Sequence, residues 1–356
     1  MLNLYSWGAN SHGQLGQGLV SEQCPKPSVV HFSKLNSITK VIGGGGHSFI
    51  ILESGQVYGC GSNKNGQLAL DEQVQNATEF QLIVSLGEHL VRDIACGWNS
   101  TIALTENNIA LVWGSNSHLQ LGLSNKSNYY KPHVLDYSVR SISMGLRHMA
   151  ILYENGSLAT AGSNSKGQLC LFDELKNPVK QSKLVVVPDM HDIIKVACGQ
   201  NHTITLTANG ELYGFGDNRF HQICANSPDS IIYVPKRILI CDYLPIDSKI
   251  LCGWTHNAIS TVDGNAILWG RNNYGQLTGT SSGPVVINNV YSLALGSEHC
   301  LCIDNDRILY TWGWNEHCNC GIENCDVVIE KTFLANDCLK IGTGFGYSFA
   351  VLSCCN

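Results

Sequence analysis

Two short motifs alternate along almost the whole sequence. The first reads W-G-x-N-x-x-G-Q-L in its fullest form, and its first Gly stands at Gly8, Gly61, Gly114, Gly162, Gly216, Gly270 and Gly313. The second reads G-x-x-H-S, and its Gly stands at Gly44, Gly97, Gly145, Gly199, Gly253, Gly296 and Gly344. The number of residues from a second-motif Gly to the next first-motif Gly is constant, whereas the number from a first-motif Gly to the next second-motif Gly varies. A module of constant length joined by variable connectors is typical of a repeated supersecondary unit with surface loops.

The constant module is predicted to be a β-hairpin. The segment that starts at His47 alternates apolar and polar residues around Ser54-Gly55, and the same phase carries Asn155-Gly156, Asn209-Gly210 and Asp263-Gly264. Asn-Gly and Asp-Gly favour tight hairpin turns because both residues can adopt a positive φ. Two copies depart from this pattern, and we expect looser turns there: Asn107-Asn108 and Asp306-Arg307.

Seven such units predict an all-β fold, a seven-bladed β-propeller that occupies residues 1–356 as a single domain. A closed ring also removes the long exposed sheet edge of an open array. Too few residues follow Gly344 to complete a hairpin, whereas the segment from Leu2 to Gly8 resembles the missing strand. We therefore expect the N-terminal strand to complete the last blade and close the ring.

Composition limits the classes of partner. The chain is 44% hydrophobic and 14% charged, carries a net charge of −6 and has no run of Lys or Arg. Nucleic acids and anionic membranes are therefore disfavoured as partners, because both normally require a basic patch. No apolar stretch approaches the ~20 residues of a membrane helix. We expect a monomer in the cytoplasm, with access to the nucleus left open.

The 16 Cys do not form the pattern of a disulfide framework. Cys96, Cys198 and Cys252 each precede a second-motif Gly, at a phase that Met144 and Leu295 fill in other copies. Cys at such a position acts as a small buried hydrophobe, which fits a reducing compartment.

The motifs, which extend from Trp7 to Ser348, resemble the regulator-of-chromosome-condensation repeat. Longer strings, such as CGWNSTIALTEN at Cys96, CGWTH at Cys252 and WGWNEHCNCG at Trp312, are similar to two groups within that superfamily. One group is the secretion-regulating, deafness-locus-associated guanine nucleotide exchange factors of animals. The other is the killer-toxin-insensitivity propellers of fungi, also described as alpha-tubulin suppressors.

The resemblance to the fungal group implies a non-catalytic scaffold. Its partner would be a small CSL-type zinc protein that serves diphthamide synthesis and Elongator-dependent modification of wobble uridine in tRNA. The resemblance to the animal group implies the alternative, an exchange-factor-like regulator of a small GTPase, or of secretion through the exocyst. The scaffold is the leading prediction, and we expect no enzymatic activity.

One feature of the superfamily argues against a nuclear role. Its prototype exchange factor uses a β-wedge insertion and a basic N-terminal tail. In this sequence the connectors from a first-motif Gly to the next second-motif Gly reach at most 37 positions, and no tail precedes Leu2. Exchange on a nuclear GTPase and nucleosome binding are therefore disfavoured.

Two sets of residues suggest metal binding, and both are better explained structurally. The third position after the second-motif Gly carries five histidines: His47, His148, His202, His256 and His299. Each belongs to a different blade, whereas metal ligands must converge within ~2 Å of one point. We expect each histidine to tie its turn to a neighbouring backbone.

The second set is the string HCNCGIENC, which contains His317, Cys318, Cys320 and Cys325. It lacks the paired C-x-x-C spacing of structural zinc sites. Cys320 also falls at the phase of Leu15 and Leu68, which predicts a core position. No catalytic, cofactor or metal site is expected.

The two residues after each second-motif Gly vary strongly between copies and should gather on one face around the axis. Trp and Arg are enriched at interaction hot spots. The predicted partner-binding rim consists of Trp98, Arg147, Trp254, Glu298, Trp314 and Glu316. The competing interpretation is that each Trp packs between blades.

Overall fold

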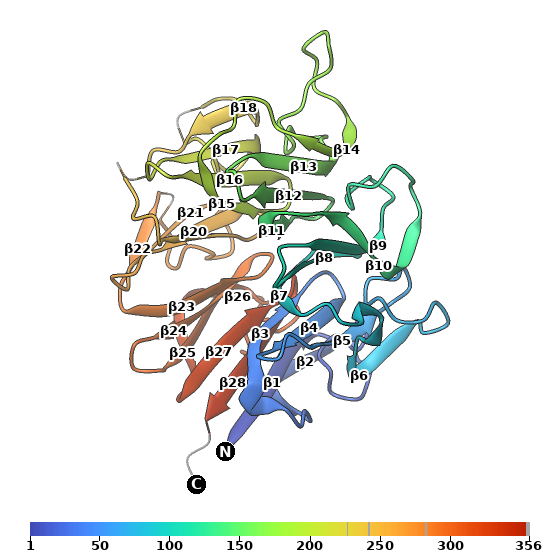
Figure 1. The fold of residues 1–356 in the computed structure, drawn as a ribbon. Helices are drawn as coiled ribbons and strands as arrows, with labels where there is room; N and C mark the ends of the chain where they lie inside the picture. Colours follow the sequence, from blue (N-terminus) through green and yellow to red (C-terminus); the bar gives the residue numbers. More distant parts are fainter. Residues whose placement is uncertain (226, 241–242, 282, 354–356) are drawn as a thin grey trace.

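The computed structural model describes residues 1–225, 227–240, 243–281 and 283–353. Within these residues the strands form seven four-stranded antiparallel sheets, arranged as blades around a central axis (Figure 1). The described helices are two short 3₁₀ turns, η1 (Leu35–Ser37) and η2 (Val84–Leu86). No helix in the described ranges is long and apolar enough to cross a membrane. The predicted all-β, seven-bladed propeller is confirmed.

Each blade has four strands, which we number outward from the axis, and blades 1 to 7 follow the chain from β3. The first, innermost strands are β3 (Ile38–Gly43), β7 (Val91–Cys96), β11 (Val139–Met144), β15 (Ile193–Cys198), β19 (Lys249–Cys252), β23 (Val290–Leu295) and β27 (Cys338–Thr343). The second strands are β4 (His47–Leu52), β8 (Ser100–Thr105), β12 (His148–Tyr153), β16 (His202–Thr207), β20 (His256–Ser260), β24 (His299–Asp304) and β28 (Tyr347–Ser353).

The two outer positions of each blade come from the later part of each repeat. The third strands are β5 (Val57–Ser62), β9 (Ala110–Ser115), β13 (Leu158–Ser163), β17 (Leu212–Asp217), β21 (Ala266–Gly270), β25 (Leu309–Trp314) and β1 (Leu2–Ala9). The outermost strands are β6 (Asn76–Leu82), β10 (Asn128–Asp136), β14 (Gln181–Val186), β18 (Ile231–Arg237), β22 (Val285–Ile287), β26 (Val327–Ala335) and β2 (Gln23–Val30).

Blade 7 joins the two ends of the chain. Its strand order is β2-β1-β28-β27, and β1 pairs with β28 from Leu2 opposite Ser353 to Gly8 opposite Tyr347. Figure 1 shows β1, in blue, beside β28, in red. The predicted closure by the N-terminal strand is confirmed, and the N-terminal segment supplies the outermost strand β2 as well.

The hairpin turns follow the sequence prediction at the Gly positions. Gly55, Gly156, Gly210 and Gly264 all have φ between 76° and 82°. The expectation of looser turns in the two divergent copies is wrong. Asn108 and Arg307 take the same left-handed φ, 62° and 64°, and their N–H groups make the same hydrogen bond three residues back. The sheet on either side therefore imposes the turn even where the sequence disfavours it.

The invariant Asn of the first motif organises the loop that follows each third strand. Its side-chain oxygen accepts a hydrogen bond from the N–H five residues later, as from Leu15 to Asn10 at 3.2 Å and from Leu169 to Asn164 at 2.8 Å. Its amide nitrogen donates to carbonyl groups further along the loop, as from Asn164 to Val179 at 2.8 Å. Because buried polar groups need partners, the loop closes around this one amide.

The hydrophobic core lies between neighbouring blades. Trp113 of blade 2 packs against Phe49 of blade 1, with ring centroids 6.1 Å apart. The Trp113 indole also donates to the carbonyl of Gln67 in the blade 1 loop at 2.8 Å. Each first-motif Trp or its replacement thus joins its own blade to the preceding one.

Candidate functional site: the turn face of the propeller

The turns between first and second strands meet around the axis on one face of the ring, which we call the turn face. The residue directly after each second-motif Gly donates its backbone N–H to the turn of the next blade, with N···O distances from 2.7 to 3.3 Å. These donor–acceptor pairs are Gly45–Gly97, Trp98–Leu146, Leu146–Gln200, Gln200–Trp254, Trp254–Ser297, Ser297–Phe345 and Phe345–Gly44. The hydrogen bonds form a closed belt, so the side chains at this phase are held at fixed positions around the axis.

Three of the belt side chains form an aromatic cap, which consists of Trp98, Trp254 and Phe345. Trp98 stacks on Phe345 at 6.1 Å between ring centroids, Trp254 meets Phe345 edge-on at 5.5 Å, and the two indoles are 6.3 Å apart. These residues come from blades 2, 5 and 7, which do not adjoin one another, so their side chains reach across the axis. Trp98 is still 44% exposed.

The cap continues towards blade 6. Trp314 is half-buried and packs edge-on against His317 at 5.1 Å. The His317 ring in turn lies beside Gly346, at which an added Cβ would stand 3.6 Å from the ring. Glu316 is exposed in the same loop, and Arg147 is exposed at the blade 3 turn.

Glu298 does not belong to the exposed rim, contrary to the sequence prediction. It is only 6% exposed, and its carboxylate accepts hydrogen bonds from Thr255 Oγ1 at 2.7 Å and from Gln276 Nε2 at 2.7 Å. Burial raises its pKa, while the two hydrogen bonds and Arg271, 3.7 Å away, oppose that shift. Because Thr255 and Gln276 belong to blade 5, Glu298 anchors blade 5 to blade 6 from below the surface. The Arg271 guanidinium also lies over the rings of Phe220 and Tyr274.

The family model described as "RCC1-like domain", where RCC1 stands for regulator of chromosome condensation, matches residues 3–350. The chain belongs to the RCC1-like family. It is 32% identical to the secretion-regulating guanine nucleotide exchange factor of Bos taurus, over 98% of this chain and 82% of that one. The same protein of Mus musculus is 30% identical over 98% and 83% of the two chains.

Solved structures agree with the RCC1-like fold. The structure of Prp20p from Saccharomyces cerevisiae, described with its binding to Gsp1p and histones, superposes with a TM-score of 0.87 over 100% of this chain and 92% of that one. Human WBSCR16 superposes with a TM-score of 0.84 over 99% of both chains. Sequence identity is 22% and 20%, so these two structures support the fold alone.

The five recurring histidines of this RCC1-like propeller join blades. Each imidazole is fully buried, and its Nε2 meets a side chain on the second strand of the next blade rather than a backbone group. The pairs are His47–Thr101, His148–Thr203, His202–Asn257, His256–Cys300 and His299–Ser348. The five histidines are therefore structural residues, but each binds a side chain of the next blade where a backbone group was expected. Burial lowers the pKa of His47, His148, His256 and His299 to about 3.

The Gly of the second motif makes room for this histidine. A Cβ at Gly145 would lie 2.3 Å from Cε1 of His148 and 2.3 Å from the carbonyl oxygen of Gly199. Any larger residue would displace either the imidazole or the next blade, which explains why Gly and His recur together three residues apart.

The cysteines in the cysteine-rich loop of blade 6 have different environments. Cys320 is fully buried in the core between blades 5 and 6, as predicted. Cys318 and Cys325 are half-buried, and each described cysteine is a free thiol. Within the described part of the chain no three His, Cys, Asp or Glu side chains converge in a way that could hold a metal ion.

Sequence reasoning missed Phe345 and His317 as members of the turn-face surface. Phe345 occupies the same repeat phase as Trp98 and Trp254, and that phase was the available signal. No signal indicated that the three rings would touch, because only ring closure brings blades 2, 5 and 7 to one axis. The resulting surface offers aromatic contact and separate exposed charges, which suits recognition of a protein.

Proposed function

We propose that this propeller regulates a small GTPase by binding it on the turn face, with the aromatic cap at the centre of the interface. The observation that carries the proposal is the cap itself, in which Trp98 is 44% exposed and Trp254 and Phe345 are half-buried. Two of its three side chains are Trp, a residue type enriched at interaction hot spots. Membership in the RCC1-like family supports it, as do the exchange-factor names of relatives that align over nearly the whole chain. Prp20p, described with its binding to Gsp1p, has the same fold.

A second feature of the cap supports a binding role. The indole nitrogen of Trp254 is buried without a hydrogen-bond partner among the described residues. An unsatisfied buried N–H costs about 1–3 kcal/mol. Positions that lower stability without a compensating contact are expected at functional sites.

The test is nucleotide release from a panel of purified small GTPases loaded with a fluorescent GDP analogue. A substoichiometric amount of the propeller should accelerate release from one member. The double variant Trp98→Ala and Trp254→Ala should lose the effect, because each truncation costs about 2 kcal/mol at a hot spot. Tyr137→Ala, which removes an exposed aromatic ring outside the cap, is the matched control and should retain full activity.

The CSL-type zinc protein is the second candidate partner, on the resemblance to the fungal group alone. A scaffold of that kind would bind its partner through the same cap without any nucleotide release. Stable capture of the zinc protein, lost in the double Trp variant, together with no acceleration for any GTPase would contradict the exchange-factor proposal and support the scaffold.

A further inference from the structure

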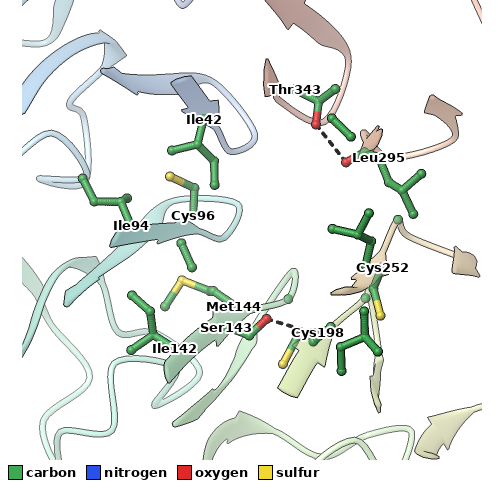
Figure 2. A pocket seen from close by; sticks show the side chains of 18 of the residues that line it. Ile42, Ile94, Cys96, Ile142, Ser143, Met144, Cys198, Cys252, Leu295 and Thr343 are labelled. Atoms are coloured by element: carbon green, nitrogen blue, oxygen red, sulfur yellow. Dashed lines mark hydrogen bonds between the residues drawn. The ribbon is translucent and has the colours of Figure 1, made fainter. Parts of the chain in front are cut away.

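The central channel has a second end, opposite the belt, and its chemistry is different. The channel is a cavity of about 670 Å³ lined by the innermost strands of all seven blades. Its walls are mostly apolar or small, as Figure 2 shows for Ile42, Ile142 and Leu295 around the open centre. Hydrogen bonds between neighbouring blades hold the wall, such as the one from Thr343 Oγ1 to the Leu295 carbonyl at 2.8 Å.

Basic side chains gather where the innermost strands begin. The charged residues that line the cavity are Lys40, Asp93, Arg140, Lys195 and Lys249, four basic and one acidic. Four of these five stand four residues before a second-motif Gly, and Arg140 stands five before. At ~3.3 Å per strand residue the first four lie about 13 Å from their second-motif Gly, and Arg140 lies about 17 Å from its own. We call the four basic residues the basic collar.

The collar has more positive charge than its neighbours neutralise. Asp93 is paired with Lys40. Among the described residues, no carboxylate lies within 4.0 Å of the cationic groups of Arg140, Lys195 or Lys249. Lys195 donates to the Ser248 carbonyl at 2.7 Å. Burial lowers the pKa of Lys195, and Lys249 and Arg140 lower it further against the opposing charge of Asp247.

Two further cations, Arg307 of blade 6 and Lys340 of blade 7, lie near Tyr291 past the collar. The Arg307 guanidinium lies 3.7 Å from the centroid of the exposed Tyr291 ring. A hydrogen bond from Arg307 lowers the pKa of Tyr291, and the charges of Lys340 and Lys249 add to the effect. Cations thus gather at one end of the channel, where Asp247 and Asp263 share a surface hollow with Lys249 and Tyr291. Positive charges held together in a cleft with low-dielectric walls attract an anionic ligand.

We infer that the basic collar binds an acidic peptide segment, with carboxylates at the collar and an apolar side chain in the channel. A small inorganic anion would satisfy the charges and leave the apolar wall uncovered, whereas a peptide can use both. The cations are mainly lysines, which act as point charges rather than as planar forks that match phosphate. This site lies at the opposite end of the channel from the aromatic cap, so it does not depend on the proposed GTPase interaction.

The experiment measures fluorescence anisotropy of a labelled peptide of alternating Glu and Leu on the full chain at low ionic strength. We expect saturable binding that weakens as salt is added. The same peptide with Gln in place of Glu should not bind. The double variant Arg140→Gln and Lys249→Gln, at two exposed positions, should bind the Glu peptide about tenfold more weakly or worse.

Two controls separate this site from a general charge effect and from the cap. Lys131→Gln with Lys183→Gln removes the same charge from the outer strands β10 and β14 and should leave affinity unchanged, as should the double Trp variant of the cap. Equal binding of the Gln peptide, or unchanged affinity in the collar variant, would overturn the inference. Tighter binding of inorganic tripolyphosphate than of the peptide would also overturn it, by identifying a small-anion site.

Discussion

At the residue scale, each invariant position of the two motifs serves one contact in the ring. The first-motif Asn closes its loop, the second-motif Gly admits an imidazole, and the histidine reaches the next blade. The hairpin Gly positions supply a positive φ that other residues adopt only at a cost of about 1–2 kcal/mol. Two predictions concern single residues of this kind.

Substitution of the hairpin glycines should show strain and steric clash separately. Gly264→Ala meets no atom closer than 3.6 Å, so it should cost about 1 kcal/mol from its φ of 82° alone. Gly210→Ala has a similar φ of 78°, and its Cβ would also lie 2.5 Å from the Leu244 carbonyl oxygen, so it should cost clearly more. Urea denaturation of both variants measures the difference. Equal or negligible losses would contradict the turn assignment.

The buried histidines predict sensitivity to acid. The pKa of His47, His148, His256 and His299 is about 3 in the folded chain and near 6.5 in the unfolded chain, so the unfolded chain binds more protons between these values. Stability should be complete above about pH 6.5 and fall as the pH drops towards 3, by up to about 1.4 kcal/mol per pH unit for each histidine. Glu298, with its raised pKa, works in the opposite sense.

Urea denaturation at a series of pH values measures this slope. His148→Gln can keep a hydrogen bond to Thr203 without a titrating ring, and its slope should be shallower by about one proton. A wild-type free energy of unfolding that is constant between pH 7 and pH 5 would show that the histidines are not buried in the neutral form.

At the element scale, the blade is the unit of packing but not of stability. Each sheet buries its faces only against the two neighbouring blades, as Trp113 does against Phe49. Blade 7 depends on this packing most, because two of its strands come from each end of the chain. Its integrity depends on pairing between segments that are far apart in the sequence.

Deletion of Met1 to Gly8 should therefore have an effect much larger than its length suggests. It removes most of β1, detaches β2 and exposes the edge of β28, and an unpaired edge strand is prone to aggregation. We expect aggregation or a melting temperature far below that of the full chain, measured by thermal melting and size-exclusion chromatography. A soluble truncated chain with unchanged melting would rule out this closure.

At the scale of the whole molecule, the ring has two chemically different ends. The belt and the aromatic cap close one end, and the basic collar surrounds the other. The ring is completed where Tyr347 takes the place of a histidine. Its hydroxyl donates to the His47 carbonyl at 2.6 Å and accepts a hydrogen bond from Ser48 at 3.0 Å.

Tyr347→Phe should weaken the whole ring through this junction. It removes one of the two hydrogen bonds that the buried His47 carbonyl accepts, the other coming from the Gly44 N–H at 2.9 Å. The loss of one such hydrogen bond costs about 0.5–1.5 kcal/mol. Tyr213→Phe, whose hydroxyl bonds Glu211 on an outer part of blade 4, is the control and should stay within about 0.5 kcal/mol of the wild type. Urea denaturation of both variants makes the comparison. Equal stability of the two would mean that the junction at Tyr347 contributes nothing to closure.

The sequence by itself determined the repeat, the number of blades, the hairpin glycines and the closing strand. These features depend on local turn chemistry and on spacing, which a linear sequence records. It could not place Glu298 beneath the surface, because that depends on Thr255 and Gln276 in the neighbouring blade. It could not assemble the aromatic cap or the basic collar either. Their members stand about one repeat or more apart in the chain, and only the closed ring brings them to a common axis.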